Sequence, residues 1–161
     1  MVRRTASEAA PSPPQQVGRW GPGLPREPAP GSHLKTVRKG YTHHGIYAGN
    51  GRVIHYAGLH RGWRAGPVEE VPIEEFARGR TVEVVAHCAL RYDREASVDR
   101  ARSRLGESRY RLLTNNCEHF CNWCLDGEQR SEQVERVMRS VLRILVAATR
   151  GDGLVAAPVK P

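Results

Sequence analysis

The stretch that decides the fold is residues 41–56, which read YTHHGIYAGNGRVIHY. β-branched and aromatic residues flank the Asn50-Gly51 pair, and this pattern is typical of a β-hairpin. Asparagine and glycine both tolerate the left-handed backbone that a tight hairpin turn requires. We therefore expect two antiparallel strands that are joined around residues 49–51.

The register of this hairpin decides which histidine shares a face with His55. A three-residue loop over residues 49–51 would pair residues 45 and 55, so that His43 and His55 become diagonal neighbours on one face. A two-residue Asn50-Gly51 turn would instead put His44 on the face of His55 and His43 on the other face, because a shift of one residue turns every side chain over. The hairpin alone leaves both registers open.

The elements expected after the hairpin follow from cap, turn and periodicity signals. These signals predict a loop over residues 59–67, a short helix over 72–78, a strand over 82–86 and a helix capped by Asp93. An extended segment over 110–113 is followed by a helix over 117–125, which Asn115-Asn116 would cap. Apolar residues at helical spacing, with arginines on the other side, predict a last helix over 132–149.

Cys117 is the most informative candidate for chemistry, because it directly follows the expected helix cap. The free amides and the dipole of a helix N-terminus favour a thiolate, so we expect a lowered pKa for this thiol. The same amides could stabilise an oxyanion on an attacked carbonyl. A thiol nucleophile also needs a base, which is usually a histidine. Cys88, Cys121 and Cys124 are expected to be reduced packing residues.

A zinc site built from Cys117, His119, Cys121 and Cys124 is the competing interpretation of this segment. The spacing contains neither two Cys-x-x-Cys pairs nor a finger pattern, and on a helix His119 would point away from the three cysteines. We therefore expect no metal and no cofactor.

Composition narrows the class of protein further. The chain has 161 residues and a formal net charge of +8, with both signs of charge interspersed, which does not favour a nucleic-acid partner. No apolar run is long enough to span a membrane, no secretory signal is visible, and the cysteines suggest reduced thiols in a cytoplasmic chain. We divide the chain into a disordered Pro-rich tail (1–30), a catalytic domain (31–127), an amphipathic helix (128–150) and a flexible tail (151–161).

Two motifs, in this order, resemble those of the lecithin:retinol acyltransferase-like domain family. The first is His43 with His55 twelve residues later, and the second is Asn-Cys-Glu-His-Phe at residues 116–120. The resemblance covers about residues 31–127. It implies a single α+β domain, with an antiparallel sheet and helices packed on it, that is a circularly permuted relative of papain-like thiol hydrolases.

The resemblance also implies roles for individual residues. Cys117 would be the nucleophile, His43 its base and His55 the residue that orients His43, which favours the three-residue loop. The thiol would take an acyl group, from a small-molecule or lipid acyl donor, as a thioester and pass it to an acceptor or to water. Glu118 and His119 belong to the motif, and structural or hydrogen-bonding roles are expected for them.

The departures from the family pattern keep other functions open. His44 stands where animal members often have tryptophan, and no membrane-spanning tail is expected. A cysteine-dependent acyltransferase or hydrolase of lipid esters is the main hypothesis, with a thiol amidase or peptidase and a catalytically inactive binding domain as alternatives. The last helix would either dock on its own domain or make a peripheral contact with an anionic membrane.

Overall fold

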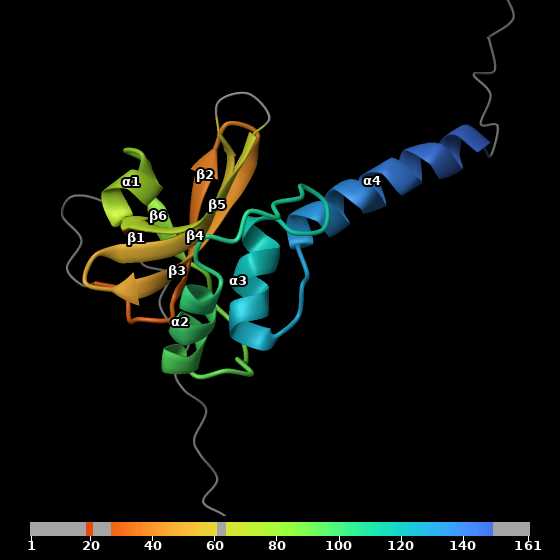
Figure 1. Cartoon of the computed structure of the whole chain (residues 1–161). Coiled ribbons are helices and arrows are strands. Elements are labelled where there is room, and N and C mark those ends of the chain that lie inside the picture. The colour runs from red at the N-terminus through yellow and green to blue at the C-terminus, as the bar shows by residue number, and fades with distance from the viewer. Residues whose placement is uncertain (1–18, 21–26, 61–63, 150–161) are drawn as a thin grey trace, which may run out of the picture.

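The computed structural model describes residues 19–20, 27–60 and 64–149, and a six-stranded antiparallel sheet is its centre (Figure 1). The strand order is β1-β6-β2-β3-β4-β5. The strands are β1 (Arg19–Trp20), β2 (His33–Arg38), β3 (Tyr41–Gly49), β4 (Arg52–His60), β5 (Arg64–Pro72) and β6 (Val82–Val84). Most of the expected tail at 1–30, and all of that at 151–161, lies outside the described residues.

The helices cover the sheet unequally. α2 (Arg94–Ser103) and α3 (Cys117–Asp126) pack on one face, whereas α1 (Ile73–Ala77) lies on the other. α4 (Glu132–Thr149) extends away from the body of the domain (Figure 1). The prediction of an α+β domain with helices on an antiparallel sheet is confirmed. Within the described residues, no helix has both the length and the apolar character that a bilayer crossing would need.

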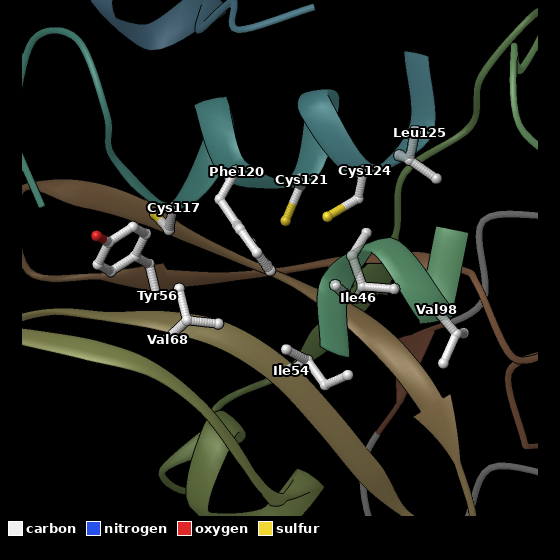
Figure 2. Close-up of a cluster of buried hydrophobic side chains, with 11 residues drawn as sticks. Ile46, Ile54, Tyr56, Val68, Val98, Cys117, Phe120, Cys121, Cys124 and Leu125 are labelled. Carbon is white, nitrogen blue, oxygen red and sulfur yellow. The ribbon is translucent and has the colours of Figure 1, made fainter. Parts of the chain in front are cut away.

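The alternation of side chains along the hairpin builds two cores. Ile46, Ile54 and Tyr56 face α2 and α3, where they meet Phe120 and Leu125 (Figure 2). The intervening residues Tyr47 and Val53 face the other way and pack with Phe76 of α1. Each strand therefore buries both of its faces, as expected for a central strand whose apolar residues do not alternate with polar ones.

The hairpin turn combines features of both expected registers. Asn50 and Gly51 have φ values of 52° and 69°, so they form a two-residue turn. The register nevertheless shifts between Tyr47 and Gly49, and the pairs Ile46–Ile54 and Tyr47–Val53 are those of the three-residue alternative. The extra residue is a β-bulge at Ala48, which puts His43 rather than His44 on the face of His55.

The other sequence predictions were confirmed in part. α4 has the predicted bounds, and Asp93 caps α2 by accepting a hydrogen bond from the amide of Ala96. The loop expected over 59–67 is wrong, because β4 continues to His60 and β5 begins at Arg64. The extended segment expected over 110–113 is a turn with a single bridge between Arg111 and Asn115. Strand β2 was not predicted.

Candidate active site

The N-terminus of α3 positions Cys117. The side chain of Asn116 accepts hydrogen bonds from the amides of Glu118 and His119, both at 3.0 Å, and His119 completes a capping box. Cys117 is therefore fixed in the first turn, with its side chain on the face of α3 that meets the sheet (Figure 2). The predicted cap and the hydrogen-bonding role of His119 are confirmed.

The environment of the Cys117 thiol differs from the sequence expectation. Burial raises the pKa of Cys117 to about 11, although the backbone amides of His44, Glu118 and Cys117 itself act to lower it. The expected lowering of the thiol pKa is thus wrong, because removal of the sulfur from water outweighs the helix N-terminus. The resting group is a neutral thiol, and it needs a base to become a nucleophile.

The sulfur lies beside the backbone that carries His43. Cys117 Sγ is 3.9 Å from the carbonyl oxygen of Thr42, and the amide of His44 also faces it. Pairing of β3 with β4 extends only from Gly49–Arg52 to Ile46–Ile54, so the two strands part before His43 and His55. The first turn of α3 meets β3 in this part of the strand, where β4 no longer pairs with it.

A histidine pair spans the parted strands. His43 Nε2 and His55 Nδ1 are 3.0 Å apart, and His55 Nε2 lies 3.6 Å from a carboxylate oxygen of Glu69 on β5. In the tautomer that fits these contacts, His43 donates from Nε2, and His55 turns its own N–H toward Glu69. That tautomer leaves His43 Nδ1 as a free acceptor, and this buried nitrogen has no hydrogen-bond partner among the described residues.

Close packing holds this pair in place. The rings of His43 and His55 lie 5.2 Å and 5.5 Å from that of Phe76, centroid to centroid. A Cβ atom at Gly45 would come within 2.6 Å of Val53 and 3.3 Å of the His55 Cβ, so only glycine fits between them. Burial lowers the pKa of His43 well below its usual range and that of His55 to about 4, so both rings are neutral at pH 7.

Charged side chains surround a small cavity at the histidine pair. The cavity has a volume of about 20 Å³, and its lining includes His43, His55 and Tyr41. Arg38, Arg78, Glu69 and Glu75 complete the rim. Tyr41 is 45% exposed, so this end of the site reaches the surface.

The root of α4 closes the other side of the site. The side-chain amide of Gln133 accepts from the Thr42 amide at 2.9 Å and donates to the Thr42 carbonyl at 3.1 Å. It also donates to Glu118 at 3.2 Å, and the same Glu118 oxygen accepts from the Ser131 hydroxyl at 2.6 Å. Gln133 thus takes the place of a β4 partner for Thr42 and links β3 to the start of α3.

His44 belongs to a different cluster from His43. Its Nδ1 lies 2.8 Å from His33 Nε2, and His33 Nδ1 lies 2.9 Å from His87 Nε2. Burial lowers the pKa of His44, whereas the Glu118 carboxylate acts to raise it. The Nε2 atom of His44 is also buried without a partner among the described residues, so variants of His43 and His44 form a matched pair.

The other three cysteines differ in their exposure to solvent. Cys121 and Cys124 are fully buried in the core between α3 and the sheet, as predicted, whereas Cys88 is exposed and the packing role expected for it is wrong. All four thiols are free. No group of three or more His, Cys, Asp or Glu side chains in the described part of the chain is placed to hold a metal ion.

Glu69 and Gln133 are the site residues that sequence reasoning missed. Glu69 pairs directly opposite His55. It was missed because a loop was expected over residues 59–67, where strand β5 begins. Gln133 contacts Thr42 across 91 residues of sequence. The β-branched residues Val68 and Val71 could have indicated a strand. The sequence holds no signal for the contact between Gln133 and Thr42.

The chain is an α+β domain in which a helix-capped cysteine and a buried histidine pair lie against the same strand. Comparison with known proteins identifies its family. The family model described as lecithin retinol acyltransferase matches residues 26–130. The chain therefore belongs to the lecithin retinol acyltransferase family.

Three relatives are similar to this chain over most of its length. Human "Phospholipase A and acyltransferase 4" is 30% identical over 144 residues, which cover 76% of this chain and 88% of the relative. Human "Phospholipase A and acyltransferase 1" is 31% identical over 142 residues, or 73% of this chain and 79% of the relative. Rat "Lecithin retinol acyltransferase" is 28% identical over 148 residues, which cover 74% of this chain and 63% of the relative.

Proposed function

We propose that this protein is a cysteine-dependent acyltransferase or acyl hydrolase that acts on lipid esters through a thioester on Cys117. The observation that carries the proposal is the free, buried Nδ1 of His43, held by His55 beside the strand segment that contacts the Cys117 sulfur. Membership of the family, and relatives named as phospholipases A and acyltransferases, support the choice of a lipid ester.

The first half-reaction forms the acyl-enzyme. His43 Nδ1 takes the proton from Cys117 Sγ as the sulfur attacks the ester carbonyl carbon. The backbone amide of Cys117, which already faces the sulfur, is suited to donate to the oxyanion. Collapse of the tetrahedral intermediate breaks the carbon–oxygen bond, and the departing alkoxide receives the proton from His43.

The second half-reaction releases the acyl group. Water or a nucleophilic acceptor attacks the thioester while His43 again takes a proton, and the thiolate that leaves is reprotonated by the imidazolium. His55 and Glu69 stabilise the imidazolium form of His43. The Nδ1 lone pair of His55 accepts the hydrogen bond from His43, and the negative charge of Glu69 lies beyond His55. Glu69 thus extends the predicted His43–His55–Cys117 set by a positioning residue.

The cellular setting is part of the same proposal. Free thiols at all four cysteines fit a reducing compartment such as the cytoplasm. A lipid ester is presented at a membrane surface, so a peripheral contact with an anionic membrane would deliver the substrate to the site.

The experiment that tests this function is the mass of the chain after brief incubation with phosphatidylcholine vesicles and acid quenching. We expect the mass to rise by one fatty acyl group, with the adduct mapped to Cys117 by peptide mass spectrometry. Hydroxylamine should remove the adduct, because it cleaves thioesters.

Matched donors separate this proposal from its alternatives. An adduct from a peptide or amide panel, with none from phospholipid, would favour a thiol amidase or peptidase. If no donor leaves an adduct and no product appears, the domain is a binding domain and the proposal fails.

A further inference from the structure

An open groove beside α3 has no role in the reaction proposed above. Its volume is about 990 Å³, and most of its wall is the segment over residues 104–115, between α2 and α3. Trp123 of α3 also lines it. A volume of this size is typical of small-molecule sites, whereas the cavity of about 20 Å³ at the histidine pair holds about one water molecule. The groove therefore has the room for a substrate group that the histidine cavity lacks.

Arginine dominates the charge of this groove. Arg104, Arg109 and Arg111 line it together with a single carboxylate, Glu107, so the lining carries two net positive charges. Glu107 accepts hydrogen bonds from Arg104 Nε at 2.7 Å and from the side-chain amide of Asn115 at 3.3 Å. The hydrogen bonds from Arg104 above all lower the pKa of Glu107 to about 2. This carboxylate is thus engaged with Arg104 and does not neutralise the other two arginines.

Arg109 and Arg111 are the cations of the groove that remain free. Both side chains are exposed, and neither has an ion pair or a hydrogen bond within the described residues. Their backbone is nevertheless held. The hydroxyl of the buried Tyr56 accepts from the Arg109 amide at 2.6 Å, and Arg111 exchanges two backbone hydrogen bonds with Asn115. An anchored segment therefore presents two unpaired guanidinium groups to the groove.

The chemistry of these two groups favours phosphate. A guanidinium group offers paired N–H donors that match two oxygens of a phosphate. A phosphate monoester carries nearly two negative charges at pH 7 and has three free oxygens, so it balances both arginines, whereas a diester carries one charge. We propose that the groove binds a phosphate monoester, to which Arg109 and Arg111 donate.

Tyr110 connects the groove with the candidate site. It lines the groove between the two arginines in sequence, and its ring lies 5.3 Å from that of Tyr56, centroid to centroid. Burial raises the pKa of Tyr110 and the Cys117 thiol adds to the effect, so the ring is within electrostatic range of the sulfur. The segment then continues directly into Asn116 and Cys117. A phosphate in the groove is therefore part of the acyl donor or the acyl acceptor, a consequence that rests on the proposed function.

Isothermal titration calorimetry of the full chain with sn-glycerol 3-phosphate tests the site directly. We expect binding, and we expect glycerophosphocholine, a diester, to bind at least about tenfold more weakly. Arg109→Gln/Arg111→Gln should bind glycerol 3-phosphate at least about tenfold more weakly, because charge-assisted hydrogen bonds are lost. Arg139→Gln/Arg143→Gln is the matched control. It removes two exposed arginines from α4 and should bind like the original chain.

Three results of this titration would overturn the proposal. They are no binding of glycerol 3-phosphate at millimolar concentration, undiminished binding by Arg109→Gln/Arg111→Gln, and equal losses in the two double variants, which would reflect net charge alone. Cys117→Ala should bind glycerol 3-phosphate normally, so the site is tested apart from catalysis. If glycerol 3-phosphate binds but no donor leaves an acyl adduct, the proposed function fails and the groove remains a phosphate site.

Turnover distinguishes the two sources of the phosphate. Dihexanoyl phosphatidic acid and dihexanoyl phosphatidylcholine, below their critical micelle concentrations, compare a monoester head group with a diester in the absence of a membrane surface. A lower KM for the phosphatidic acid, with competitive inhibition by glycerol 3-phosphate, would assign the groove to the head group of the acyl donor. This preference should disappear in Arg109→Gln/Arg111→Gln.

Acylation of glycerol 3-phosphate would instead assign the groove to the acyl acceptor. In that step a hydroxyl oxygen of glycerol 3-phosphate forms the new ester bond, and the carbon–sulfur bond to Cys117 breaks. The hydroxyl proton passes through His43 to the sulfur. Equal KM values for the two donors, without acylation of glycerol 3-phosphate, would overturn the link between the groove and the reaction.

Discussion

Replacement of Cys117 by alanine is expected to lower turnover of a lipid ester by at least about 10⁴-fold. In thiol and serine enzymes the nucleophile, its base and the oxyanion donors act as a unit, so loss of the nucleophile removes the covalent route altogether. Cys117 is buried at the first position of α3, and no other thiol in the described residues lies beside the histidine pair. Initial rates with phosphatidylcholine vesicles provide the measurement.

Cys121 supplies the matched control for this variant. It lies one turn further along α3, is fully buried in the same core and faces the same sheet (Figure 2). Cys121→Ala should lower the unfolding temperature slightly and leave turnover per folded molecule within about twofold, since the lost volume is small. Substantial activity in Cys117→Ala would contradict the thioester mechanism.

Replacement of His43 by asparagine should reduce turnover by about 10³-fold, whereas the same change at His44 should reduce it only a few-fold. The two histidines are neighbours on β3, and both are buried. His43 is bonded to His55, whereas His44 is bonded to His33 and lies in the other cluster. A larger loss in His44→Asn than in His43→Asn would reverse the assignment of the base.

The pH dependence of the original chain provides a further check on His43. Only neutral imidazole can accept the thiol proton, and burial lowers the pKa at which His43 becomes charged. Turnover should therefore persist as the pH falls through about 6.5, the ordinary histidine pKa, and should disappear only below it. A decline centred at or above about pH 6.5 would contradict a buried neutral base.

Protonation of the buried histidines also lowers the stability of the folded chain. A histidine with a lowered pKa binds its proton more readily when the chain is unfolded, so acid favours unfolding. The contribution of His55, whose pKa falls to about 4, is fully present above about pH 6.5 and is lost as the pH falls toward 4. The folded fraction has to be measured at each pH so that loss of structure is not counted as loss of chemistry.

Local signals predicted much of the fold. The Asn116 cap, the Asn50-Gly51 turn, the Asp93 cap and the bounds of α4 are each properties of a few consecutive residues. Such signals act in the folded chain as they do in a peptide, because their hydrogen bonds and backbone angles involve near neighbours. The motifs around His43, His55 and Cys117 also identified the family before any geometry was known.

Long-range features of the site were beyond that reasoning. The turn has two residues, but the bulge at Ala48 gives the strands the register expected from a three-residue loop. The hairpin sequence alone did not predict this combination. Glu69 reaches His55 only because β5 pairs with β4. Gln133 reaches Thr42 only because β4 does not pair with β3 at that point.

The division between sequence and tertiary structure is clearest at Cys117. The sequence by itself determined that this cysteine begins a capped helix and follows two histidines in the order of its family. Only the tertiary structure decided that the thiol is buried, that its pKa rises to about 11, and that a β-bulge brings His43 to the face of His55. A cap depends on neighbours in sequence, whereas desolvation and pairing across a sheet depend on which distant segments exclude the water.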